Sequence, residues 1–235
     1  MSTFAELEQR KYYAKTAAEY EQMHLHGDEE TRFAISLLPG LIATLGIRSV
    51  LDLGSGTGRA LYALKVACPD IKLLGLEPVP EMREIGYRNG LTRDELIGGD
   101  AQALAFEDKS FDLVCEFAML HHVPKPALVV AEMLRVAKSA IFISDSNNFG
   151  QGSAIARLVK QLLNAAGLWP AANWVKTRGK VYNITPGDGL AYSYSVFNNY
   201  QQIAKACQRV HVINIGGDGR SSYRSAPHVA LVGIK

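Results

Sequence analysis

Residues 49–58, which read SVLDLGSGTG, constrain the fold of this chain more than any other stretch. An apolar run typical of a short buried strand comes first, and three glycines then occupy every second position. A helical pattern of apolar residues begins near Arg59 and ends before Pro69. A glycine turn between a strand and a helix lets a ligand approach the backbone, where the first helical turn offers free N–H groups. The stretch therefore predicts a ligand-binding turn.

The spacing of the glycines narrows the choice of ligand. The dinucleotide fingerprint is G-x-G-x-x-G, whereas this chain reads G-x-G-x-G and has Arg59 where the late glycine would stand. This difference weakens the prediction of a dinucleotide site without excluding it. A P-loop is excluded, because no Gly-Lys-Ser/Thr sequence closes the turn.

Acidic residues at the ends of further strand-like runs favour a nucleoside ligand. Glu77 ends the run 73–77, about 20 residues after the glycine turn, which is the spacing at which a carboxylate meets ribose hydroxyls. Asp100 follows the strand-like residues 96–99, and another short strand is expected at 111–116. Because the carboxyl ends of parallel strands meet at one edge of a sheet, we expect these acids beside the glycine turn.

The segment from about residue 50 to residue 145 resembles the class I S-adenosylmethionine-dependent methyltransferases. Residues 52–58 (DLGSGTG) are similar to the first motif of that family. Residues 111–114 (FDLV) with 120–123 (LHHV) are similar to the fourth motif, and residues 132–136 (EMLRV) resemble the helix before the fifth strand. The resemblance implies S-adenosylmethionine as the cofactor and methyl transfer as the activity.

The resemblance also implies which residues hold the cofactor. In that family the Glu77 position binds the ribose, and the position of residues 99–101 binds the adenine. A leader helix with a tyrosine near Tyr20 caps the site in related methyltransferases, although the simpler interpretation of its tyrosines is packing of the helix onto the domain. The expected cofactor-binding residues are Tyr20, Asp52, Gly54, Ser55, Gly56, Glu77, Pro78, Asp100, Ala101 and Phe117.

Alternating strand and helix patterns predict a single α/β domain with a doubly wound, mostly parallel sheet. The resemblance implies a seven-stranded sheet of the Rossmann-like methyltransferase fold, with N-terminal helices, an insertion after strand 5 and an antiparallel final strand. Strands are expected near 49–53, 72–77, 95–98, 111–116, 139–145, 210–215 and 228–234. Helices are expected near 3–25, 28–46, 59–67, 80–89, 101–104, 125–137, 153–166 and 198–207. Residues 192–197 alternate like an edge strand, and Pro39 is expected to break or kink the second helix.

The single domain, residues 1–235, is expected to have four parts. They are a helical cover at 1–46, a cofactor-binding core at 47–145, an insertion at 146–195 that forms an acceptor lid, and the final helix and strands at 196–235.

Composition is that of an ordinary globular protein, which we expect in the cytoplasm. The chain has 235 residues, 48% of them hydrophobic, and its formal net charge of +2 argues neither for nor against nucleic acid. No apolar run of about eighteen residues and no signal peptide is visible, so we expect no membrane contact. Cys68, Cys115 and Cys207 are widely spaced and are expected to be reduced thiols.

Two histidines and one aspartate are the candidates for catalysis. His121 and His122 follow the fourth expected strand and Asp145 ends the fifth, so all three are expected at the lip of the pocket. A histidine suits a general base because it titrates near neutral pH, and Asp145 could orient it or bind a substrate hydroxyl. The structural alternatives are that His122 packs against the loop before Pro124, that His121 is solvated, and that Asp145 accepts bonds from loop amides.

The acceptor is expected to be a small molecule that is methylated at oxygen or nitrogen and bound by the 146–195 insertion. An RNA methyltransferase is the first alternative, but residues 116–119 read EFAM where such enzymes carry Asp/Asn-Pro-Pro-Tyr/Phe. A non-catalytic S-adenosylmethionine-binding protein and a nicotinamide dehydrogenase are the others. Neither a metal site nor a nucleic-acid partner is expected, and an oligomer is compatible with the sequence.

Overall fold

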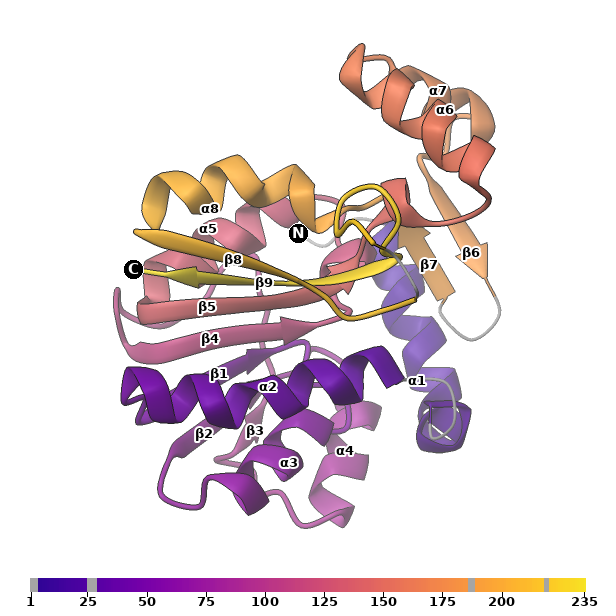
Figure 1. The fold of residues 1–235 in the computed structure, drawn as a ribbon. Helices are drawn as coiled ribbons and strands as arrows, with labels where there is room; N and C mark the ends of the chain where they lie inside the picture. The colour runs from indigo at the N-terminus through magenta and orange to yellow at the C-terminus, as the bar shows by residue number, and fades with distance from the viewer. Residues whose placement is uncertain (1–3, 25–28, 186–188, 218–219) are drawn as a thin grey trace.

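The computed structural model describes the backbone of residues 4–24, 29–185, 189–217 and 220–235, and of these it leaves undescribed the side chains of residue 6 and residues 18–24. Its centre is a seven-stranded sheet in the order β3-β2-β1-β4-β5-β9-β8 (Figure 1). The strands of this sheet are β1 (Ser49–Leu53), β2 (Lys72–Leu76), β3 (Leu96–Ile97), β4 (Phe111–Phe117), β5 (Ala137–Ser146), β8 (Arg209–Asn214) and β9 (His228–Ile234). Strands β1 to β5 pair in parallel, whereas β9 is antiparallel to both β5 and β8.

The strand order confirms the predicted Rossmann-like methyltransferase fold and creates a crevice at its centre. From β1 the chain moves outward through β2 to β3, and it then returns to place β4 on the other side of β1. Open α/β sheets bind ligands at such a reversal, outside the carboxyl ends of the strands. The glycine turn after β1 and the residues after β4 therefore meet where a ligand is expected.

Eight α-helices are described. They are α1 (Phe4–His24), α2 (Glu29–Leu45), α3 (Arg59–Ala67), α4 (Pro80–Arg88), α5 (Pro126–Val136), α6 (Ala154–Ala165), α7 (Trp169–Lys176) and α8 (Tyr200–Ala206). Three short 3-10 helices accompany them: η1 (Leu120–His122), η2 (Asn148–Gly150) and η3 (Val196–Asn199). A separate antiparallel hairpin consists of β6 (Tyr182–Thr185) and β7 (Gly189–Tyr192).

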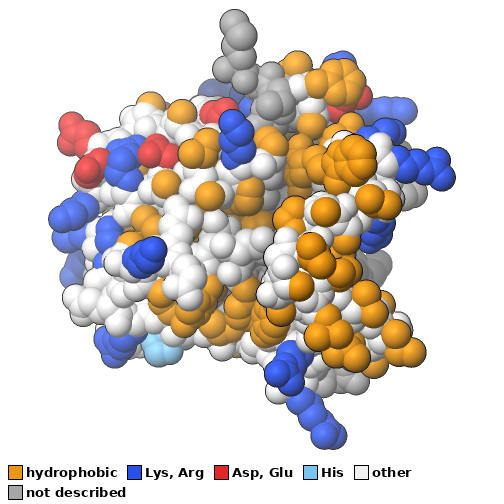
Figure 2. All heavy atoms as spheres, turned by 90° about the horizontal axis from the view of Figure 1, so that it is seen from above, with side chains coloured by type: hydrophobic (Ala, Val, Ile, Leu, Met, Phe, Trp, Pro, Cys, Tyr) orange, Lys and Arg blue, Asp and Glu red, His pale blue; other side chains and the backbone are white. Residues whose placement is uncertain are grey.

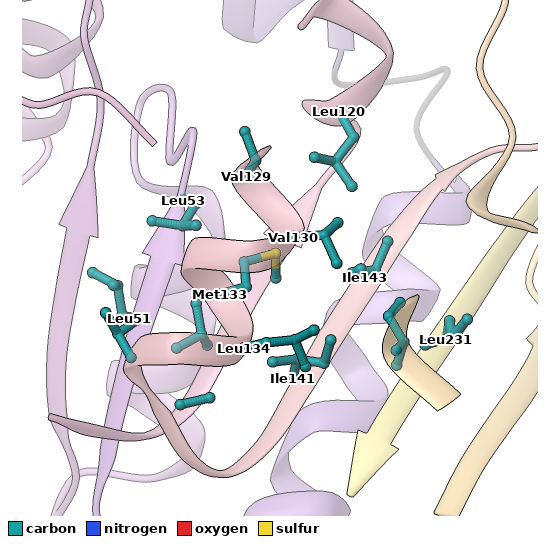
Figure 3. Close-up of a cluster of buried hydrophobic side chains, with 14 of the residues drawn as sticks. Leu51, Leu53, Leu120, Val129, Val130, Met133, Leu134, Ile141, Ile143 and Leu231 are labelled. Atoms are coloured by element: carbon teal, nitrogen blue, oxygen red, sulfur yellow. The ribbon is translucent and has the colours of Figure 1, made fainter. Parts of the chain in front are cut away.

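The two faces of the sheet carry different helices because side chains alternate along each strand. Val50 of β1 belongs to a core cluster with residues of α2 and α3, such as Leu38 and Leu64. Leu51, its neighbour, belongs to a second cluster on the opposite face, which α5 and α8 cover. Figure 3 shows Met133 and its neighbours on α5 directed at the side chains of β1 and β5. Burial on both faces explains the apolar runs that the sequence has at these strands.

The structure corrects four of the expected elements. Residues 101–104 form a turn instead of a helix, because the Asp100 carboxylate accepts the backbone N–H of Gln102 and closes a tight local loop. Helix α2 continues through Pro39 without a break, and a kink at this residue stays a prediction. Residues 192–197 are no continuous strand, since β7 ends at Tyr192 and η3 begins four residues later. Helix α7 and strand β6 lie in a stretch where the sequence predicts no regular element.

No helix in the described part of the chain is long and apolar enough to cross a membrane. All three cysteines are free, with Cys115 buried and the other two half-buried. The division of the domain at residues 46, 145 and 195 stays a prediction.

Candidate active site at the carboxyl ends of the parallel strands

The glycine turn after β1 has the backbone conformation that its sequence predicts. Gly54 and Gly56 have positive φ values of 67° and 56°, which residues with a side chain rarely adopt. A β-carbon at Gly54 would also stand 2.5 Å from Cγ of Met119, the residue that precedes η1. The backbone N–H of Gly54 donates to the carbonyl of Leu76, which ties the turn to β2. The turn and the segment after β4 are therefore in close contact at the base of the crevice.

A cavity of about 270 Å³ lies above this turn. That volume is close to the lower end of the range for ligand pockets, about 300–1,000 Å³. The lining residues come from helices α1 to α5, the last residues of β2 and β4, the turns after β1, β2 and β3, and the segment after β4. They are Gln9, Arg10, Tyr13, Thr31, Gly54, Gly56, Arg59, Leu76, Glu77, Pro78, Val79, Met82, Gly99, Asp100, Ala101, Gln102, Phe117, Ala118, Met119, His122, Val123 and Val129.

Glu77 is the buried carboxylate of this cavity. Its Oε1 accepts the backbone N–H of Val79 at 2.8 Å, and its Oε2 accepts the backbone N–H of Gly56 at 3.0 Å. Burial raises the pKa of Glu77 to about 7, although these two N–H groups and the nearby Arg83 and Arg10 oppose the shift. The carboxylate still has lone pairs to offer, because each oxygen can accept more than one hydrogen bond. Glu77 can therefore accept ligand hydroxyls from within the cavity.

The other predicted cofactor residues divide between two neighbouring spaces. Pro78, Asp100, Ala101 and Phe117 line the main cavity together with Gly54, Gly56 and Glu77. Asp52 and Ser55 instead line a smaller cavity of about 30 Å³, which shares both glycines with the main one. The backbone of Tyr20 is helical, but its side chain lies outside the described residues. The individual roles of these residues stay predictions.

Asp52 is a second buried carboxyl group behind the turn. Burial raises its pKa to about 7, against the opposing effect of hydrogen bonding with Ser55 and Cys115. The thiol of Cys115 lies 3.8 Å from Oδ1 of Asp52. Two carboxyl groups that titrate near neutral pH thus flank the glycine turn, since Glu77 behaves in the same way.

Helix α1 contributes Gln9, Arg10 and Tyr13 to the wall of the main cavity. Arg10 forms an ion pair with Asp100, another residue of that wall, with an N–O distance of 3.8 Å. Gln9 accepts the backbone N–H of Leu190 in β7 at 2.5 Å, so α1 is also tied to the β6–β7 hairpin. The sequence predicts a capping helix, but it does not single out Gln9 or Arg10. Helical spacing could have found them, because Gln9 and Arg10 precede Tyr13 by four and three residues and residues so spaced share one helix face.

His122 lines the cavity and contacts both α1 and β7. Its Nδ1 lies 2.7 Å from the carbonyl oxygen of Leu190, which can only accept, so Nδ1 carries the proton. The amide nitrogen of Gln9 lies 3.1 Å from the same Nδ1, but because both groups are then donors this longer contact is not a hydrogen bond in that tautomer. With Nδ1 protonated, Nε2 is the acceptor for the Tyr13 hydroxyl, at 2.9 Å. His122 thus presents the basic nitrogen of a neutral imidazole to a phenol that also lines the cavity.

His121 is directed elsewhere. Its ring Nδ1 lies 2.7 Å from Oδ1 of the fully buried Asp145, and its backbone N–H donates to Oδ2 of the same carboxylate. Burial opposes ionisation of Asp145, but the charge and hydrogen bond of His121 hold its pKa below the usual value. His121 is absent from the lining of the main cavity. Sequence reasoning could not separate the two histidines, because only the fold of η1 decides which one faces the ligand.

Glu116 completes a buried group of ionisable residues beneath η1. Its carboxylate accepts the backbone N–H groups of Met119 and Ser144. Burial and repulsion by Asp145 raise its pKa well above the usual value. Glu116 therefore fastens the residues after β4 to β5, which is consistent with a structural role for this acid.

The 146–195 insertion reaches the site only indirectly in this structure. Among the described residues, none between 146 and 195 lines the main cavity. Leu190 bonds to two of the lining residues, Gln9 and His122. The acceptor lid therefore stays a prediction. The described residues contain no group of three His, Cys, Asp or Glu side chains that could hold a metal ion.

The residues of the cavity fit S-adenosylmethionine. A nucleoside needs a carboxylate for its sugar hydroxyls, and Glu77 is buried against the cavity with lone pairs to spare. It also needs a close backbone approach, which the positive φ values of Gly54 and Gly56 permit. Asp100 and Ala101 line the same cavity, where they can contact the base of the nucleoside.

Comparisons with known proteins agree with this fit. Residues 51–143 match the family described as a methyltransferase domain. A phosphatidylethanolamine N-methyltransferase of Cereibacter sphaeroides is 30% identical over 130 residues, which cover 48% of this chain and 57% of that protein. A demethylmenaquinone methyltransferase of Thermotoga maritima is 35% identical over 98 residues, 42% of each chain. This chain thus spans about a third to just over half of the length of the curated relatives it matches.

A solved structure shows the same fold over nearly the whole chain. The S-adenosylmethionine-dependent methyltransferase of Aquifex aeolicus aligns with a TM-score of 0.58 at 15% identity, covering 93% of this chain and 97% of that one. Residues 51–143 are thus similar to a methyltransferase domain, and the chain has the fold of S-adenosylmethionine-dependent methyltransferases, with a cavity whose residues fit that cofactor.

Proposed function

We propose that this chain transfers the methyl group of S-adenosylmethionine to an oxygen or nitrogen atom of a small-molecule acceptor, with His122 as general base. The observation that carries the proposal is that Glu77 and His122 line one cavity. A carboxylate suited to a sugar and an imidazole suited to a proton then share a single space, as a methyl transfer to a hydroxyl or an amine requires.

In this reaction the protein has to place the two reactants and remove a proton from the acceptor. S-adenosylmethionine, when bound, supplies a methyl group activated on a sulfonium, and the sulfur leaves as a neutral thioether. Holding two reactants in line is worth about 7–11 kcal/mol of barrier. In this chain Gly54, Gly56 and Glu77 would hold the cofactor, and Gln9, Arg10 and Tyr13 of α1 would keep water from the cavity that they line.

His122 is suited to accept a proton because the short contact with the Leu190 carbonyl favours the tautomer protonated on Nδ1. The carbonyl of Leu190 holds the proton on Nδ1, which leaves the lone pair of Nε2 on the side of Tyr13. An acceptor that replaces the Tyr13 hydroxyl as the partner of Nε2 would hand its proton directly to His122. General bases of this kind contribute about 10²- to 10⁴-fold to the rate.

Binding and turnover test the proposal in sequence. Titration calorimetry with S-adenosylmethionine, S-adenosylhomocysteine and NAD should show binding of the first two and none of NAD. An acceptor screen with a methyl-labelled donor should then include amines, phenols, phosphatidylethanolamine and demethylmenaquinone, because the last two appear in the names of the relatives. Tight NAD binding, or no transfer to any acceptor in a metabolite extract, would contradict the proposal.

Single substitutions then test the role of the base. His122→Asn should lower kcat by about 10²-fold or more while leaving the affinity for S-adenosylhomocysteine within a few fold. His211→Asn, at an exposed histidine of β8, is the matched control and should have no effect. Unchanged kcat in His122→Asn would remove His122 as the base.

A further inference from the structure

Helix α6 attaches to the protein through its polar face. Lys160 donates to the carbonyls of Asn148 and Gln151 at the start of the insertion. Gln161 donates to the carbonyls of Phe149 and Arg224, each at 3.0 Å. These two residues lie on one side of the helix, and it is this side that faces the fold. An ordinary surface helix buries its apolar side instead.

The apolar side of α6 is consequently turned to solvent. Ile155, Leu158, Val159 and Leu162 recur at helical spacing, and none of the α6 residues is buried. Ile155 is 77% exposed and Leu162 is 61% exposed. Figure 2 shows hydrophobic side chains gathered over this part of the molecule, with Lys and Arg side chains at the margins.

Helix α7 shows the same inversion in part. Its polar Asn173 and the following Thr177 are buried, whereas Trp174 and Val175 are 57% and 68% exposed. The other tryptophan, Trp169, is buried, and its indole N–H donates to the Ser193 hydroxyl at 3.1 Å. Both helices therefore direct polar groups at the fold and expose aliphatic or aromatic groups to solvent. We call this surface, formed by Ile155, Leu158, Val159, Leu162, Trp174 and Val175, the apolar face.

All charged residues in the stretch of sequence that contains α6 and α7 are basic. The chain has no Asp or Glu between Asp145 and Asp188, and in that stretch it has five basic residues, Arg157, Lys160, Lys176, Arg178 and Lys180. The formal net charge of the whole chain is only +2, so this stretch holds more positive charge than the chain as a whole. Lys160 and Arg157 of α6 bond to backbone carbonyls, whereas Lys176, Arg178 and Lys180, at the end of α7 and just after it, are exposed.

These features favour an anionic lipid surface over a second copy of the chain. A symmetric dimer would bring two such basic stretches together, and like charges across an interface oppose association. A helix with aliphatic and Trp side chains on one side and Lys or Arg beside them is typical of the interface of a membrane. Anionic lipids attract such basic residues, whereas the hydrocarbon region accepts the apolar ones.

We propose that α6 and α7 form a membrane-docking element, which places the apolar face in the interfacial region of an anionic bilayer with the exposed Lys176, Arg178 and Lys180 at the headgroups. This differs from the expectation of no membrane contact, which rested on the lack of a spanning segment. The proposal is independent of methyl transfer, because it concerns a surface on which no cavity residue lies.

Flotation with lipid vesicles tests the proposal on the full chain. The wild type should float with vesicles of phosphatidylcholine and phosphatidylglycerol, should float much less with phosphatidylcholine alone, and should detach at high salt. The double variant Leu158→Glu/Leu162→Glu should lose at least tenfold in bound fraction at limiting lipid. Val66→Glu is the matched control, because Val66 is an 85% exposed apolar residue on α3, and it should float like the wild type.

Tryptophan fluorescence gives a second readout that reports on the face itself. The chain has two tryptophans, and Trp169 is buried, so a blue shift on adding vesicles should come from Trp174 and vanish in Trp174→Phe. Wild-type protein that stays unbound with anionic vesicles, or a double variant that floats as well as the wild type, would overturn the proposal. Concentration-dependent self-association that Leu158→Glu/Leu162→Glu abolishes, without vesicle binding, would assign the face to a second copy instead.

Discussion

Glu77 offers a sharp test of the cofactor site, because its charge and its hydrogen bonds are both visible in the structure. Glu77→Gln keeps the size of the side chain and removes the charge. A hydrogen bond to a charged group is worth about 1.5–3 kcal/mol, so we expect the dissociation constant of S-adenosylmethionine at pH 8 to rise by roughly 10- to 150-fold. Only one of the two N–H groups that hold Glu77, those of Val79 and Gly56, can bond to the single carbonyl oxygen of Gln, so part of the loss reflects the other N–H group left without its acceptor.

The same residue predicts how binding depends on pH. Burial raises the pKa of Glu77 to about 7 in the free protein. Sugar hydroxyls bind the ionised carboxylate, so wild-type affinity should fall by up to about tenfold for each pH unit below 7. In Glu77→Gln this dependence should flatten, and any slope that remains would belong to Asp52, whose pKa is also raised to about 7.

Calorimetry between pH 6 and pH 8 measures both effects. Glu81→Gln is the matched control, because Glu81 is an exposed acid in the first turn of α4 and the substitution removes the same charge nearby. It should bind like the wild type. Equal affinities of wild type and Glu77→Gln at pH 8 would show that Glu77 does not contact the ligand.

Three further predictions concern other residues. Burial raises the pKa of Asp52 to about 7, so between about pH 4 and pH 7 the folded chain keeps a proton that the unfolded chain has lost, and stability falls as the pH rises through this range. Asp52→Asn should therefore raise the unfolding free energy of the ligand-free protein at pH 8 by roughly 2–4 kcal/mol, measured by urea titration. Arg10→Ala should weaken S-adenosylmethionine binding by fivefold or less, and less at high salt, because the ion pair with Asp100 is partly exposed and worth about 0–1 kcal/mol. Asn147→Ala should cost about 1–3 kcal/mol by thermal unfolding, since the buried Asn147 amide bonds to three carbonyls of residues 222–226 and to Ser195; a loss under 0.5 kcal/mol would be roughly what a surface substitution causes and would contradict that role.

The core of the fold was predictable because local patterns and topology agree there. The glycine turn and the spacing to Glu77 depend on a strand, a turn and a helix that are adjacent in sequence, and the structure keeps all three. The short helix expected at 101–104 does not form, because the Asp100 carboxylate accepts the backbone N–H of Gln102 and so competes with helical hydrogen bonds.

The rest of the site depends on contacts between distant segments. Gln9 meets Leu190 across 181 residues, and no local pattern encodes such a contact. His121 and His122 are equivalent in sequence, and only the packing of η1 turns the second toward the cavity. Likewise, periodicity identifies the apolar stripe of α6, but the direction in which it faces follows from bonds that Gln161 makes to Phe149 and to a loop 63 residues away.

A crystal structure of the complex with S-adenosylhomocysteine would show where the nucleoside binds. We predict electron density for the nucleoside between the glycine turn and Glu77, with the sugar hydroxyls within hydrogen-bond distance of that carboxylate and the base beside Asp100. Density for the ligand anywhere else, or a cavity closed by side chains of α1 in crystals grown with saturating ligand, would contradict it.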